Sequence, residues 1–261
     1  MRRAVLVVLL AAVAVAGCRG DDDRREAIES YIESVNSAQA RLKPAFTDAQ
    51  VALRAFAAGR VTERTAERLQ GGNATMRATR ARLGLIQPPP EAKKLHADLL
   101  RLVGLQSDLA LELSLAADYV IRLGPAVEPA QGAAGKLGRE LRAANTGEEQ
   151  VVALREFAGD VGATLTRIDA LAPPPAMVPW HDNQRGKLAK SQHDALALAD
   201  AIEQRDAPAV EDALKAFTTP ASDTVPRKAQ AAAIRGFNSK LRTQERLLTR
   251  IAREQLALGG V

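Results

Sequence analysis

Two histidines and one tryptophan are the side chains of this chain best placed to do chemistry. His96 and His181 end two copies of one motif, RLGLIQPPPEAKKLH at 82–96 and RIDALAPPPAMVPWH at 167–181, so corresponding residues lie 85 apart. Imidazole is the commonest metal ligand, and Trp180, next to His181, has an aromatic face suited to a ligand groove. One hypothesis is therefore a small-ligand, metal or haem site formed by His96, Trp180 and His181.

A second hypothesis gives these residues structural roles. Metal sites in helical bundles usually use Glu-x-x-His pairs on facing helices, and the sequence contains no such pair. His193 follows His181 by twelve residues, which places it on a different helix face. Each of the paired histidines would then hydrogen-bond the backbone of its own corner, and Trp180 would seal a helix end. We favour this second hypothesis and expect no metal and no cofactor.

The triple prolines before each histidine predict how the chain is built around it. Pro88–Pro90 and Pro173–Pro175 cannot lie inside a helix, because proline lacks an N–H and clashes with the preceding turn. Proline does fit the first turn of a following helix, so we predict two helix–PPP–helix corners. The likeness extends back to Tyr31 and Tyr119, each of which precedes a Leu-Arg-Ala triplet by 22 residues.

Apolar residues recur at heptad spacing along most of the chain, which is typical of helices that cross at a shallow angle. We expect Pro44 to kink the first helix, Pro125 and Pro129 to bend or end the third, and Asn73 to mark a loop or helix break. Thr62 and Thr146 are expected to cap helices. No stretch alternates as a strand does. Helices are predicted at about 24–58, 62–86, 89–123, 137–144, 146–171, 177–205, 206–217 and 227–257.

Together these patterns predict an all-α fold, namely an elongated antiparallel helical bundle built from two tandem repeats with triple-proline corners. The first repeat is expected to span 27–118. The second is expected to span 119–261 and to include a C-terminal helix that closes the bundle.

The first residues of the chain have the organisation of a secretory signal. MRRAVLVVLLAAVAVAGC begins with Arg2 and Arg3, continues with an apolar run at 4–16 that is too short to span a membrane, and ends in small residues before Cys18. The end, Val15-Ala16-Gly17-Cys18, resembles the lipobox of bacterial lipoprotein signal peptides.

That resemblance implies that residues 1–17 are removed and that Cys18 carries a diacylglyceryl group on sulfur, with fatty acids such as palmitate. Two acyl chains are enough for stable anchoring, and residues 18–26 would be the lipidated cysteine and a charged tether. We therefore expect an extracytoplasmic protein anchored to the bacterial cell membrane, or to the outer membrane where the envelope has two.

Composition and motifs argue against several classes of function. Without Arg2 and Arg3, 34 Lys and Arg face 31 Asp and Glu, and no basic patch is interleaved with aromatic residues, so a nucleic-acid partner is not expected. The sequence has no Ser-His-Asp context, nucleophile elbow or glycine-rich phosphate loop, so we do not expect an enzyme. We expect an interaction or scaffolding protein whose partner is an envelope protein or the cell wall. The alternative is a small-ligand or metal-binding bundle at His96, Trp180 and His181.

Overall fold

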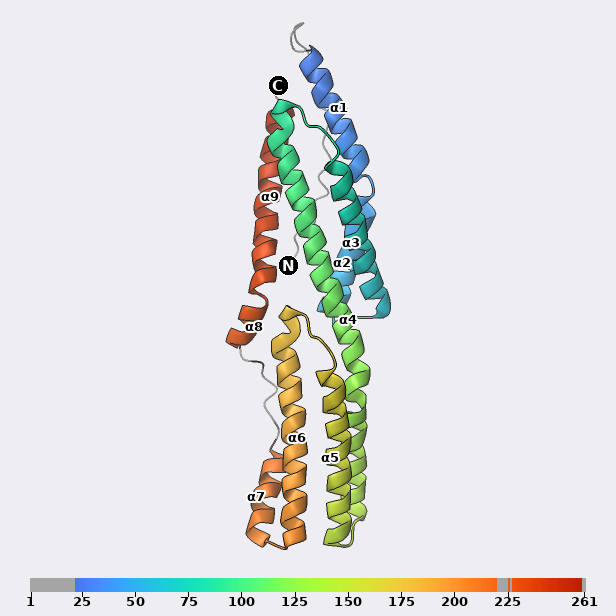
Figure 1. The fold of residues 1–261 in the computed structure, drawn as a ribbon, viewed down its shortest axis with the longest axis vertical. Helices are drawn as coiled ribbons and strands as arrows, with labels where there is room; N and C mark the ends of the chain where they lie inside the picture. The colour runs from blue at the N-terminus through green and yellow to red at the C-terminus, as the bar shows by residue number, and fades with distance from the viewer. Residues whose placement is uncertain (1–21, 220–224, 226, 260–261) are drawn as a thin grey trace. The chain divides into compact units, whose positions relative to one another are not determined.

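The computed structural model describes residues 22–219, 225 and 227–259, and this part of the chain is helical and contains no strand (Figure 1). The all-α prediction is confirmed. Two short 3-10 turns, Pro90–Ala92 and Pro175–Met177, accompany the α-helices. The helices are α1 (Asp22–Gln39), α2 (Leu42–Ala57), α3 (Glu63–Leu83), α4 (Lys93–Ala143), α5 (Gly147–Asp169), α6 (Val178–Gln204), α7 (Ala207–Thr218), α8 (Arg227–Ala233) and α9 (Arg235–Gly259).

The expected signal peptide, 1–17, and the lipidation site, Cys18, lie outside the described residues. Residues 22–26, which we expected to belong to the tether, form the start of α1, and the rest of the expected tether, 18–21, lies outside the described residues. Among the described helices, none combines the length and apolar character needed to cross a membrane.

The described helices pack into two compact units, whose boundary falls after Ala117 inside α4. The first unit contains α1, α2, α3, the first part of α4, and α9. Its core is formed by buried side chains of all five helices, among them Val35, Leu42, Met76, Leu99 and Ile251. The C-terminal helix, which we expected within 119–261, therefore packs in the first unit.

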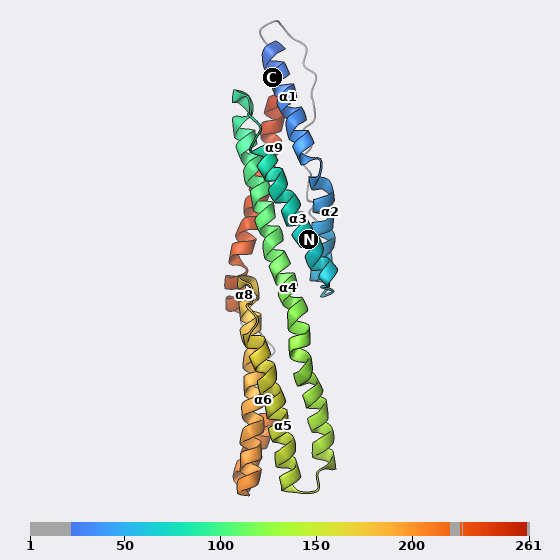
Figure 2. The ribbon, with the colours of Figure 1, turned by 45° about the vertical axis from the view of Figure 1, so that its right-hand side comes forward.

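Ion pairs reinforce the position of α9 against α4 in the first unit. Lys240 pairs with Glu112, and the Arg250 Nη2 donates to the Asp98 Oδ1 at 2.6 Å. Both views show α9 running alongside the first part of α4 (Figure 1, Figure 2).

The second unit contains the rest of α4 with α5, α6, α7 and α8. Leu137 of α4, Leu154 and Phe157 of α5, and Leu198 of α6 form its main core, and Phe217 of α7 packs against them. A neighbouring cluster contains Tyr119, Leu123, Ala126 and Ile168, with Trp180 packed on it.

Prolines account for two differences between prediction and structure. Pro44 was expected to kink one long helix, but α1 ends at Gln39 and α2 begins at Leu42. This break places Pro44 in the first turn of α2, where a missing N–H costs no hydrogen bond. In contrast, α4 continues through Pro125 and Pro129. Neither proline is buried, so the carbonyls they leave unbonded can meet water.

Two further elements differ from expectation. Asn73 lies inside α3 and is buried, and its side-chain oxygen accepts from the Ser107 hydroxyl at 2.9 Å. The buried hydrogen bond explains why this polar residue is accommodated in a helix. The last predicted helix is divided at Ile234 into α8 and α9.

The expected caps are confirmed. Thr62 begins α3, with its side chain accepting from the Thr65 N–H, and Thr146 begins α5 in a capping box with Glu149. Asp206 caps α7, and Gly59 ends the α2 region with a φ of 65°, a conformation that glycine adopts without strain.

Candidate functional site

Each triple-proline corner holds the start of one helix against the end of another. The last turn of the helix before each corner contains a fully buried residue, Leu83 at the end of α3 and Ile168 one residue before the end of α5. A 3-10 turn that begins at the third proline leads into α4 in the first corner and α6 in the second. His96 lies in the first turn of α4, and His181 lies in the first turn of α6.

In the first unit His96 bonds to a tyrosine from α1. The Tyr31 hydroxyl lies 3.3 Å from the His96 Nδ1, and the two rings meet edge-on with centroids 5.8 Å apart. Both side chains are buried, with 3% of Tyr31 and 7% of His96 exposed. A buried hydrogen bond of this kind joins α1 to the helix that follows the corner.

In the second unit His181 makes the equivalent contact. The Tyr119 hydroxyl of α4 lies 2.9 Å from the His181 Nδ1, and Tyr119 is fully buried. The half-buried Trp180 packs its ring against Tyr119 at a centroid distance of 6.4 Å, nearly perpendicular to it. Trp180 therefore packs on the cluster that contains Tyr119.

Burial favours the neutral forms of Tyr31, His96 and Tyr119. It raises the pKa of the Tyr31 hydroxyl far above its ordinary value and lowers the pKa of His96. The pKa of Tyr119 is raised by burial first and then by the negative charge of Asp182. A neutral tyrosine and a neutral imidazole share one proton in the bond between them, and either can be the donor.

These contacts correct one detail of the structural hypothesis. We expected each histidine to bond the backbone of its own corner, but each Nδ1 meets a tyrosine hydroxyl on a different helix. The tyrosines were recognised as repeat positions but not as partners of the histidines. Their equal placement before a Leu-Arg-Ala triplet in both copies was the signal that could have found the pairing.

The three residues proposed for ligand binding are not gathered at one site within a unit. His96 belongs to the first unit, whereas Trp180 and His181 belong to the second. His193 is exposed on α6. Within the described part of the chain, no three His, Cys, Asp or Glu side chains are grouped closely enough to hold a metal ion.

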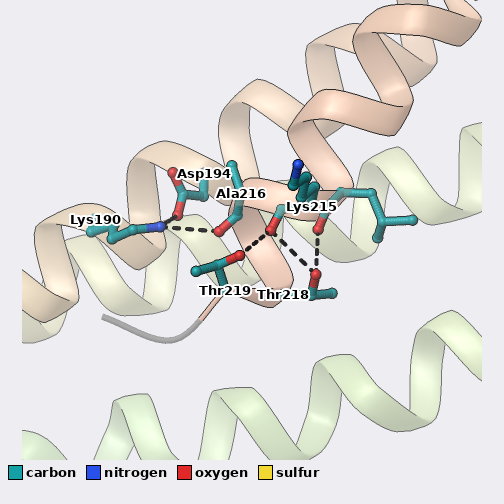
Figure 3. A network of polar contacts seen from close by, with 7 residues as sticks. Lys190, Asp194, Lys215, Ala216, Thr218 and Thr219 are labelled. Carbon is teal, nitrogen blue, oxygen red and sulfur yellow. Dashed lines mark hydrogen bonds and ion pairs between the residues drawn. The ribbon is translucent and has the colours of Figure 1, made fainter. Parts of the chain in front are cut away.

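A second polar cluster lies where α7 ends against α6 (Figure 3). Lys190 pairs with Asp194 one turn along α6 and donates to the Ala216 carbonyl at 3.0 Å. The hydroxyls of Thr218 and Thr219 donate hydrogen bonds to backbone carbonyls in the last turn of α7. A cation on the last carbonyls of a helix stabilises that helix end, so the cluster has a structural explanation.

The chain was also compared with known proteins. No family model matches it, and neither the curated proteins nor the solved structures contain a significant match.

Proposed function

We propose that this protein is a bacterial lipoprotein, anchored through Cys18 on the extracytoplasmic side of a membrane, and that its helical part acts by binding other envelope components rather than by catalysis. The observation that carries the anchor is the sequence Val15-Ala16-Gly17-Cys18 after a basic and then apolar leader. Two acyl chains on that cysteine are sufficient for stable attachment.

The non-catalytic role is supported by how the paired histidines are used. Both are buried and bonded to buried tyrosines, so their Nδ1 atoms are engaged in joining helices. A general base must be within reach of a substrate proton, and a buried imidazole held in this way is poorly placed for that task. The partner we propose is an envelope protein or a cell-wall component.

We further propose that the helical part consists of two tandem repeats. Support comes from positions 85 residues apart that are almost fully buried in both units. In each pair no residue is more than 2% exposed, and the pairs are Leu69 and Leu154, Met76 and Val161, Thr79 and Thr164, and Leu83 and Ile168. The triple prolines and the two histidines share this spacing of 85 residues, and each histidine bonds a tyrosine, although Tyr31 and Tyr119 lie 88 residues apart.

The anchor is tested by replacing its thiol. Cys18→Ala should move the protein from the membrane fraction to the soluble fraction, because no helix among the described residues is long and apolar enough to cross a membrane in place of the lipid. Ser30→Ala, on an exposed position of α1, is the matched control and should remain bound. Firm membrane attachment of the Cys18→Ala protein would show instead that residues 4–16 are retained as an inserted segment.

The alternative function is a small-ligand or metal-binding bundle at His96, Trp180 and His181. It predicts stoichiometric metal or a visible absorbance band in protein purified from its host. The interaction role predicts neither, and instead predicts a defined envelope partner recovered with the anchored protein.

A further inference from the structure

Two leucines are far more exposed than the other large apolar side chains. Leu85, just after α3, is 82% exposed, and Leu256, near the end of α9, is 79% exposed. The next value among the described residues is 57%, for Val152. An isolated exposed leucine needs no explanation. Both of these leucines, however, belong to the first unit, and the contacts near them place them toward the same end of it.

Both leucines lie toward the end of the first unit at which α1 starts. Near that end, the Arg24 Nε of α1 lies 2.9 Å from the Glu91 Oε1 of the proline corner. The Lys94 Nζ, two residues into α4, lies 3.1 Å from the Glu254 Oε1 of α9. The start of α1, the corner and the end of α9 are therefore neighbours, as Figure 1 also shows.

A residue close to each leucine in the sequence packs against the core of the first unit. Ile86 follows Leu85, and Leu258 lies two residues after Leu256. Both Ile86 and Leu258 are partly buried and pack against the core of the first unit. Leu85 and Leu256 are therefore exposed on backbone that the packing of Ile86 and Leu258 fixes in place.

The chain length before α1 limits how far this end can lie from a membrane. Only residues 19–21 separate Cys18 from Asp22, the first residue of α1. Four Cα–Cα steps span at most about 14 Å. If Cys18 carries lipid, as proposed above, the start of α1 is held within that distance of the acyl-bearing residue.

We propose that this end of the first unit is a second membrane contact, in which Leu85 and Leu256 enter the interfacial layer of the bilayer that holds the acyl chains of Cys18. An exposed arginine precedes each leucine by three residues, Arg82 before Leu85 and Arg253 before Leu256. Arginine can bond headgroup phosphates while an apolar neighbour lies deeper. The contact would restrict the orientation of the unit on the membrane, which a lipid anchor alone does not do.

The inference can be tested with single cysteines in the full, acylated chain. Leu85→Cys and Leu256→Cys each add one free thiol, because the sole natural cysteine, Cys18, is blocked by its lipid. Each thiol is labelled with an environment-sensitive fluorophore, and the protein is placed in phosphatidylethanolamine–phosphatidylglycerol vesicles with bromine on the acyl chains. Arg60→Cys is the control: it is exposed and precedes α3, whose 21 residues place it about 30 Å from Leu85.

We expect the bromine to quench labels at 85 and 256 strongly and the label at 60 not at all. Equal, background quenching at all three positions in vesicle-bound protein would overturn the membrane contact while leaving the anchor intact. A concentration-dependent blue shift without bromine quenching would overturn it in favour of contact between two copies. A chain that stays free of the vesicles, with Cys18 open to labelling, would overturn both the anchor and the contact that depends on it.

Discussion

At the scale of single residues, the two buried Tyr–His hydrogen bonds are expected to stabilise the fold. Each joins the helix after a proline corner to another helix of the same unit. When one partner of a buried hydrogen bond is removed, the other loses water without gaining a replacement, which costs about 1–3 kcal/mol. Removing either member of a Tyr–His pair should therefore lower the free energy of unfolding measurably.

Tyr31→Phe and His96→Ala are expected to be coupled, because they remove opposite ends of one bond. Each should lower the free energy of unfolding by about 1 kcal/mol or more, and the double variant should lose less than the sum.

The combination of His96→Ala with His181→Ala should instead be additive, since the two bonds lie in separate units. Urea unfolding of the three single variants and the two double variants measures this. Strong non-additivity between His96 and His181 that appears only with added divalent metal would favour a shared ligand.

Stability should also fall with acidification through His96. Its pKa is lowered by burial in the folded protein, so the unfolded chain binds more protons near and below the ordinary histidine pKa of about 6.5. This contribution is complete above that pH and is lost as pH falls through the folded value. Unfolding midpoints compared at about pH 7.5 and about pH 5.5 should drop less for His96→Gln than for the natural chain. An equal drop would rule out His96 as a source of the pH dependence.

Part of this site could be read from the sequence, and part could not. The repeated prolines identify His96 and His181 as equivalent, because proline has few permitted places in a helical chain. The partner of each histidine depends on how helices more than 60 residues apart pack together. Periodicity gives the buried face of a helix, but not which residue on the facing helix it meets.

At the scale of helices, local rules predict the ends well. Thr62 and Thr146 cap α3 and α5 as expected, because a cap depends only on residues within one turn, and Asp206 caps α7 in the same way. Prolines inside helices are harder to interpret. The chain breaks before Pro44, which lies in the first turn of α2, whereas Pro125 and Pro129 lie within α4. None of the three prolines is buried, so neither the sequence nor exposure alone separates the two outcomes.

The attachment of α9 depends on a pair that sequence reasoning missed. Asp98 of α4 has a side chain only 9% exposed, and its charge is balanced by Arg250 of α9. Arg250→Ala should leave a buried carboxylate unpaired and cost about 2 kcal/mol, less than for a fully buried pair because Arg250 is itself half exposed. Arg242→Ala, on the exposed side of α9, is the matched control and should change stability by less than about 0.5 kcal/mol. Equal effects in thermal unfolding would contradict this role.

At the scale of the whole molecule, fold class follows from composition and periodicity, whereas domain organisation does not. The heptad seams and the absence of alternating stretches predict helices, and the described residues are helical. The grouping of α9 with the first unit could not be predicted, because α9 is separated by over a hundred residues from α4 positions such as Glu112 that it contacts. Its amphipathic pattern is compatible with either unit.

The central claim is that this chain is a lipoprotein anchored through Cys18, and the intact mass of the mature protein from its host tests it most directly. We predict a chain that begins at Cys18 and carries the added mass of a diacylglyceryl group, released as fatty acids on alkaline hydrolysis. A chain that still begins at Met1, or that begins elsewhere with an unmodified Cys18, would contradict the account.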